Sequence, residues 1–309
     1  MKAAQQRAVQ PNKEARLIGG HVSASGGVVK AVERAAAIGA NCLQLFSGSP
    51  RVWQRPSLAQ TDPNKVSSKM QELVISSIFT HALYLVNFAS ENPELVRKST
   101  DAVLFDLEFD AHLGSVSRGV TVHLGSHQGR GWLAVRDQVV RTMAALIERA
   151  PRTSTFLIEN AAGQNGKIGS ELEEIRWLLD ELKTDQVGWT FDTCHAHAAG
   201  YYLGEAVPAA KPEKEAVPVR SALAEIERLS LSSALKCVHV NDSRDPFGSG
   251  RDRHANLGEG LITAADLRHF LTHPLIHEAP LILEVPGIEA EGPDAENIQR
   301  LKNLVIKEK

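Results

Sequence analysis

Short apolar segments with β character alternate with helical segments along this chain, and this alternation constrains the fold most. Eight such pairs follow one another over about 290 residues. Strands that alternate with helices form parallel sheets, and eight of them are typical of a closed (β/α)8 TIM barrel. Some segments, such as TFLIE, are almost continuously apolar, as in strands covered on both faces. An open doubly wound sheet is the alternative, although the sequence contains no GxGxxG or GxxxxGK[ST] phosphate loop.

Each pair has bounds that the sequence predicts. The expected strand segments are 17–21, 41–48, 78–86, 119–127, 155–160, 187–192, 235–242 and 280–287. Within 119–127, 155–160, 235–242 and 280–287, the strands are expected to end at His123, Glu159, His239 and Glu284. The expected helices are 30–40, 62–76, 93–113, 132–150, 171–182, 220–229, 263–273 and 291–307, with Thr263 as an N-cap. The Pro- and Lys-rich stretch 204–219 is an excursion to which the sequence assigns no role.

The composition fits a single globular domain. The chain is 43% hydrophobic and 23% charged, and residues 16–309 suffice for one barrel. Residues 1–15 are polar and lack the apolar core of a signal peptide, so we expect a flexible tail. No apolar run approaches the roughly 20 residues of a membrane helix. Three cysteines without a CxxC pair favour a reducing, cytoplasmic environment over disulfides or a cysteine zinc site.

Polar side chains stand where the expected strands end. In a barrel, the C-terminal ends of the strands converge on one mouth, where active sites form. A single histidine or carboxylate at such a place is more often structural, but here there are many. Six lie at or near the ends of different strands: His81, His123, Glu159, Asp192, His239 and Glu284. Three more follow a strand end or lie in the loop segment RDRH: His195, Asp252 and His254.

Four of these nine residues are carboxylates. Like charges held close together either protonate or need cations, and burying an unpaired ion costs several kcal/mol. The strand ends lack enough lysines and arginines to pair them all. Five histidines and four carboxylates suit Zn²⁺ first and Mn²⁺ next. Nine ligands suffice for three ions if one carboxylate bridges, and clustered ions favour phosphoryl transfer or hydrolysis.

Several motifs occur in a characteristic order: GGHVSASGG, HALYLVN, VHLGSH, IENAAGQ, FDTCHAHAAG, HVNDS, RDRHANLGEG and LILE. With them, the chain from about Leu17 onward resembles the endonuclease IV family, the metal-dependent AP endonucleases of base-excision repair. FDTCHAHAAG together with RDRHANLGEG is the most specific part of this resemblance.

The resemblance implies a (β/α)8 barrel with three zinc ions per chain, with Mn²⁺ possible in some sites. The first ion would be held by His81, His123 and Glu159. The second would share Glu159 and be held also by Asp192, His239 and Glu284. The third would be held by His195, Asp252 and His254. His21 and His197 are given no ligand role.

The implied reaction is hydrolysis of the DNA phosphodiester 5′ to an abasic site, which leaves a 3′-hydroxyl and a 5′-deoxyribose phosphate. Glu159 would be the catalytic carboxylate that orients or deprotonates the attacking water. The implied partner is double-stranded DNA containing abasic sites, bound by a monomer. Arg51 and Tyr84 match the family's residues that insert at the lesion, and Arg253 is a further expected DNA contact.

The formal net charge of −3 includes the ligand carboxylates, so three divalent ions would make the loaded protein weakly basic. We expect DNA affinity that falls with salt, from a patch on the mouth-side loops. The patch comprises Arg51, Arg55, Arg130, Arg244, Arg251 and Arg253.

The chain departs from the family pattern at two places. Thr80, Ala82 and Leu83 replace a proline and a short polar pair around the first ligand, and Leu124 replaces the proline of HPGSH. We expect these changes to alter loops that contact DNA.

Two other functions remain open from the residues. A sugar isomerase or epimerase of the same barrel fold would use similar residues around one or two metals, without the third group. A DNA-binding or structural protein would keep the scaffold without catalysis. The complete set of candidate ligands argues against this second alternative.

Overall fold

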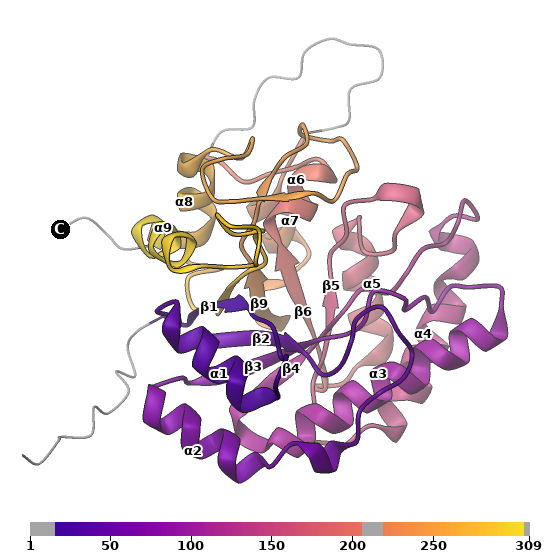
Figure 1. Ribbon diagram of the computed structural model, residues 1–309. Helices are drawn as coiled ribbons and strands as arrows, with labels where there is room; N and C mark the ends of the chain where they lie inside the picture. Colours follow the sequence, from indigo (N-terminus) through magenta and orange to yellow (C-terminus); the bar gives the residue numbers. More distant parts are fainter. Residues whose placement is uncertain (1–15, 206–218, 306–309) are drawn as a thin grey trace, which may run out of the picture.

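The computed structural model describes residues 16–205 and 219–305, which form a closed barrel of parallel strands with helices around it (Figure 1). The strands follow the order β1-β12-β9-β6-β5-β4-β3-β2, so the expected TIM barrel is confirmed and the open sheet is excluded. The barrel strands are β1 Ile18–His21, β2 Cys42–Phe46, β3 Ser77–His81, β4 Ser117–Val122, β5 Phe156–Glu159, β6 Val187–Asp192, β9 Leu235–His239 and β12 Leu281–Leu283. The expected tail 1–15 and most of the excursion 204–219 lie outside the described residues.

The helices follow the predicted alternation closely. Their bounds are α1 Val28–Ala37, α2 Pro63–Leu73, α3 Pro93–Leu113, α4 Trp132–Arg149, α5 Leu172–Leu182, α6 Thr193–Ala198, α7 Ala222–Arg228, α8 Ala264–Thr272 and α9 Ala295–Val305. The Thr263 side chain accepts the Asp266 N–H at 3.1 Å, so the predicted N-cap of α8 is confirmed. No helix among the described residues combines the length and apolar character needed to cross a membrane.

One predicted strand was too long, and one short helix was not predicted. β3 ends at His81. Ala82 N–H still donates to the Thr121 carbonyl of β4 at 2.8 Å, but the apolar residues after it turn away from the sheet. No helix was predicted directly after Asp192, but these residues form the short helix α6. Asp192 starts this helix because its side chain accepts the His195 N–H at 2.8 Å. This helical turn sets the direction of the His195 side chain.

The barrel interior below the mouth is apolar. Cys42, Phe79, Leu157, Cys237 and Ile282 pack together inside it, each completely buried. A larger apolar cluster fills the space between strands and helices. Burial on both faces explains why the strands are almost continuously apolar. The polar residues at the strand ends therefore lie directly above a packed core.

The long loop after β9 is organised by one buried carboxylate. Asp242 accepts backbone N–H groups from Ser243, Gly258, Gly260 and Ile262 at 2.8–3.0 Å. Asp242 belongs to the short strand β10 (Asp242–Ser243), which pairs with β11 (His254–Ala255). This pairing fixes the position of His254, where the loop returns to the barrel. A Cβ at Gly260 would lie 2.4 Å from the Asp242 Oδ1 atom, which explains the glycine in LGEG. The fold thereby brings RDRH to the mouth.

Candidate metal centre

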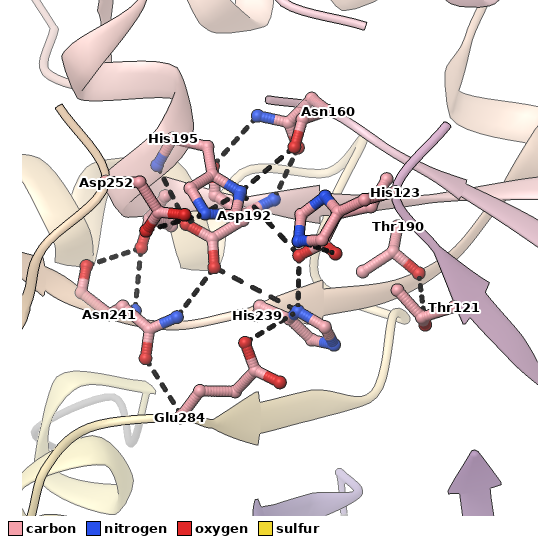
Figure 2. Close-up of polar contacts among 12 residues, drawn as sticks. Thr121, His123, Asn160, Thr190, Asp192, His195, His239, Asn241, Asp252 and Glu284 are labelled. Carbon is pink, nitrogen blue, oxygen red and sulfur yellow. Dashed lines mark hydrogen bonds and ion pairs between the residues drawn. The ribbon is translucent and has the colours of Figure 1, made fainter. Parts of the chain in front are cut away.

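All nine predicted ligand residues converge at the C-terminal end of the barrel. His81, Glu159, Asp192 and His239 are the last residues of β3, β5, β6 and β9, while His123 and Glu284 directly follow β4 and β12. Figure 2 shows most of them turned toward one another. Their donor atoms form three groups, each within 4.8 Å: His81, His123 and Glu159; Glu159, Asp192, His239 and Glu284; His195, Asp252 and His254.

Glu159 belongs to two of these groups. Its Oε2 atom lies 3.2 Å from His81 Nε2 and 3.1 Å from His123 Nε2. Its Oε1 atom lies 2.8 Å from His239 Nδ1. The carboxylate is completely buried, and its two oxygens point to different sets of ligands. This is the geometry that a bridging carboxylate needs.

The third group lies beside the second. Asp252 Oδ1 is 3.1 Å from His195 Nε2 and 3.3 Å from His254 Nε2. Asp192 Oδ2 lies between the groups, 3.9 Å from His239 Nδ1 and 3.8 Å from His254 Nε2. Asp192 and His195 therefore belong to different groups although only two residues separate them.

The histidines are held so that one nitrogen of each faces the carboxylates. His81 Nδ1 donates to the Ala82 carbonyl at 2.7 Å, and His195 Nδ1 donates to the Asn160 carbonyl at 3.0 Å. His254 Nδ1 donates to the Glu284 carbonyl at 3.2 Å. A carbonyl oxygen only accepts, so the Nε2 atom of each neutral ring carries a lone pair.

A lone pair that faces a carboxylate oxygen needs a proton or a cation between the two atoms. His254 Nε2 is buried and has no hydrogen-bond partner among the described residues. The donor set of imidazole nitrogens and carboxylate oxygens is the one that Zn²⁺ and Mn²⁺ take. The residues present therefore fit divalent cations.

The electrostatics of the site point the same way. Burial lowers the pKa of His195, but Asp192 and Asp252 outweigh it and raise this pKa to about 10. Burial also lowers the pKa of His254, but contact with Asp252 and the charge of Asp192 outweigh it and raise this pKa to about 9. Burial raises the pKa of Glu159, but His123 and His239 hold it well below its usual range. Glu159 therefore remains ionised and requires positive charge beside it.

Several residues that support the ligands were not predicted. Asn241 Nδ2 donates to Asp192 Oδ2 at 2.6 Å, and Asn160 Nδ2 donates to the Asp192 carbonyl at 3.1 Å. Lys167 Nζ lies 3.4 Å from Asp252 Oδ2. His21 Nδ1 lies 2.9 Å from Glu284 Oε1, and buried Gln44 contacts the same oxygen. Asn160 directly follows Glu159 and Asn241 lies two residues after His239, both within the family motifs, which was a usable signal.

The predicted DNA contacts lie around the mouth. A cavity of about 460 Å³ contains residues of all three groups and has Tyr84 in its lining. The Tyr84 side chain is 59% exposed and stands edge-on to Phe46, at the rim of this cavity. Arg51 is exposed in the loop after β2. Arg253 is also exposed, and its Nε atom donates to Asp245 at 2.6 Å.

Two other arginines of the expected patch are engaged within their own loops. Arg55 donates to the carbonyl groups of Ser49 and Val52. Arg130 donates to the carbonyl groups of Ala89 and His127. These contacts shape the mouth loops and leave less of both guanidinium groups free for phosphates.

The departures from the family pattern point inward. Thr80 and Leu124 are completely buried, and Ala82 and Leu83 are 1% and 2% exposed. Their side chains therefore do not form part of the exposed rim, and the expectation that they alter loops that contact DNA stays a prediction.

Comparisons with known proteins agree with this geometry. The family described as xylose isomerase-like TIM barrel matches residues 32–304. A protein named probable endonuclease 4 from Haloquadratum walsbyi is 35% identical over 93% of this chain and 98% of its own length. One from Thermosipho africanus is 33% identical over 87% of this chain and 92% of its own.

Solved structures give the same result. The crystal structure of endonuclease IV from Thermus thermophilus superposes with a TM-score of 0.75 at 30% identity, covering 93% of this chain and 98% of that one. A 3-keto-D-glucoside 4-epimerase from E. coli superposes with a TM-score of 0.64 at 15% identity, covering 94% and 99%. The second likeness shows the shared barrel fold alone.

Removing divalent cations should make stability depend on pH in a defined direction. The pKa values of His195 and His254 in the folded metal-free protein, about 10 and about 9, lie above the ordinary value of 6.5. Their stabilisation is therefore complete below about pH 6.5 and is lost as the pH rises from there through about 9 and about 10. We expect the melting temperature of chelator-stripped protein to fall over this range in calorimetry.

Zinc-loaded protein should melt at a higher temperature, and its melting temperature should vary less with pH, because the cations replace the protons between the ligand atoms. Equal melting temperatures for stripped and loaded protein across this pH range would contradict the expectation.

Proposed function

The chain belongs to the endonuclease IV family, and on this premise we propose that it is a base-excision-repair AP endonuclease that hydrolyses the phosphodiester 5′ to an abasic site. The products would be a 3′-hydroxyl and a 5′-deoxyribose phosphate. The observation that carries the proposal is the sharing of Glu159 between two ligand groups, with a third group beside them. A cluster of this kind suits displacement at phosphorus, where charge develops on both the attacking and leaving oxygens.

We propose that the three groups hold three divalent cations, Zn²⁺ first and Mn²⁺ in some sites. Bound there, such cations would supply Lewis-acid chemistry for phosphodiester hydrolysis, lowering the pKa of water and neutralising charge on phosphate oxygens. The nine residues are His81, His123, Glu159, Asp192, His195, His239, Asp252, His254 and Glu284.

Glu159 is the proposed catalytic residue. It is a buried carboxylate whose pKa lies well below its usual range, so it stays ionised and accepts hydrogen bonds. Its Oε2 atom faces His81 and His123 beside the mouth cavity, where a water approaching the phosphate would lie. Glu159 would hold the attacking water by accepting one of its protons in a hydrogen bond.

The DNA contacts follow from the rim of the cavity. Tyr84 presents an exposed ring next to the candidate centre, and Arg51 lies in the neighbouring loop, with Tyr84 N–H donating to the Pro50 carbonyl at 3.2 Å. An abasic nucleotide has lost its base stacking, so a wedge that displaces it costs less than at an intact step. Arg253 keeps donors free beyond its Asp245 pair and would contact a phosphate.

An epimerase is the second candidate, favoured only by the shared barrel. Such an enzyme has no need of the third group, formed by His195, Asp252 and His254. Metal content separates the two functions. About three ions per chain would support the endonuclease, and about one would support the epimerase.

The direct test is incubation of the metal-loaded protein with a duplex that carries one abasic site. We expect a nick 5′ to the site, abolished by chelator and restored by Zn²⁺ or Mn²⁺. The same duplex without the abasic site is the control and should remain intact. Absence of a chelator-sensitive nick would remove the proposed activity.

Replacing the shared carboxylate should be severe. Glu159→Gln should lower the cleavage rate by several orders of magnitude, because the amide cannot bridge two cations or accept hydrogen bonds at both of its atoms. Rates and metal content should be measured together. Asp110→Asn, at a buried carboxylate that accepts the Gly119 N–H at the opposite end of β4, is the matched control and should keep its rate. Near wild-type activity of Glu159→Gln would contradict the bridging role.

The exposed ring of Tyr84 should matter for lesion binding. Tyr84→Ala should weaken binding of the abasic duplex about 10-fold, since stacking of an aromatic side chain on a base contributes about 1–3 kcal/mol. Tyr84→Phe keeps the ring and should bind like wild type, and neither change should alter the metal content. Binding is measured by fluorescence anisotropy. Equal affinities of the wild type, Tyr84→Ala and Tyr84→Phe would exclude a wedge role for Tyr84.

A further inference from the structure

Gln44 is a polar residue within β2, between apolar neighbours, and it is completely buried. Its amide contacts two residues of the second ligand group. Gln44 Nε2 donates to Glu284 Oε1 at 2.6 Å, and Gln44 Oε1 lies 2.9 Å from His239 Nε2. β2 is hydrogen-bonded to β1 and β3, whereas His239 and Glu284 belong to β9 and the end of β12. The side chain therefore reaches across the barrel interior.

These contacts determine the orientation of the amide. The Glu284 carboxylate only accepts, so the NH₂ group of Gln44 must face Glu284 and the amide oxygen must face His239. The amide oxygen in turn only accepts, so His239 carries its hydrogen on Nε2. The lone pair of the neutral ring is then on Nδ1, which lies 2.8 Å from Glu159 Oε1 and 3.3 Å from Glu284 Oε2.

Glu284 is restrained in the same way. Its Oε1 atom is occupied by Gln44 and by His21 Nδ1, at 2.6 and 2.9 Å. Its Oε2 atom is left facing His239 Nδ1. One amide thus selects one nitrogen of His239 and one oxygen of Glu284, and both selected atoms face the centre of the second group.

We propose that Gln44 is a positioning residue for the second cation. It prepares His239 Nδ1 and Glu284 Oε2 as ligand atoms before a cation enters. The inference rests on the proposed function in requiring that the second group binds a divalent cation. Groups that orient metal ligands in this way typically contribute roughly 10- to 100-fold in metal affinity.

The test uses Gln44→Met in the full chain, because methionine keeps the length and most of the volume of glutamine but makes neither hydrogen bond. Zinc affinity of the stripped protein is measured by competition with a chelator. We expect one ion of the wild-type complement to bind roughly 10- to 100-fold more weakly in the variant and the others to bind unchanged. Excess zinc should restore cleavage of the abasic duplex, while the KM for DNA stays that of wild type.

Thr121→Val is the matched control. It removes a buried side-chain hydrogen bond, between Thr121 and Thr190 at 3.0 Å in the same barrel, that touches none of the ligands (Figure 2). It should bind zinc like wild type. If metal-free Gln44→Met melts at a much lower temperature than metal-free Thr121→Val, Gln44→Asn serves as a second variant. Its shorter side chain cannot span both partners, so the same loss of zinc affinity is expected.

Three results would overturn the inference. Unchanged zinc affinities in both Gln44 variants, with wild type binding its full complement, would refute only the role of Gln44. An equal loss of affinity in Thr121→Val would show a general effect of barrel stability. Wild-type protein that binds no zinc would refute the proposed metal centre itself, and this inference with it.

Discussion

The mouth of this barrel is governed by the electrostatic repulsion among four carboxylates held close together. Glu159 and Asp192 are completely buried, and Glu284 and Asp252 lie beside them. Proximity of this kind is unfavourable unless positive charge lies between the groups. The raised pKa values of His195 and His254 show how strongly the site attracts positive charge. The three groups of ligand atoms show where cations would supply this charge.

The rest of the structure fixes the directions of these groups. Backbone carbonyls hold one nitrogen of His81, His195 and His254, and Asn241 holds Asp192. Each contact removes a rotamer or tautomer that would turn a donor atom away. The supporting atoms come from the strands and from the short elements that follow them, so the barrel positions the centre. The exposed rim, with Tyr84 and Arg51, remains available for DNA.

Much of this arrangement could be predicted from the sequence, for a physical reason. Parallel strands bring their ends together, so a polar residue at each end of an apolar run already implies one cluster. The family resemblance supplied the grouping of ligands, which no spacing reveals. The contacts of Gln44 were beyond prediction because its partners lie 195 and 240 residues away and a lone polar residue in an apolar strand carries no signal. The turn after His81 was missed because Ala82, Leu83 and Val86 are buried like strand residues although the strand itself ends at His81.

The central claim is that the mouth holds three cations, two of them sharing Glu159. The most direct measurement is a crystal structure of the zinc-loaded protein with anomalous data collected at the zinc absorption edge. We predict three peaks, one within each ligand group, with the two oxygens of Glu159 each contacting a different ion. A single peak, or peaks that leave Glu159 without contact to two ions, would contradict this account.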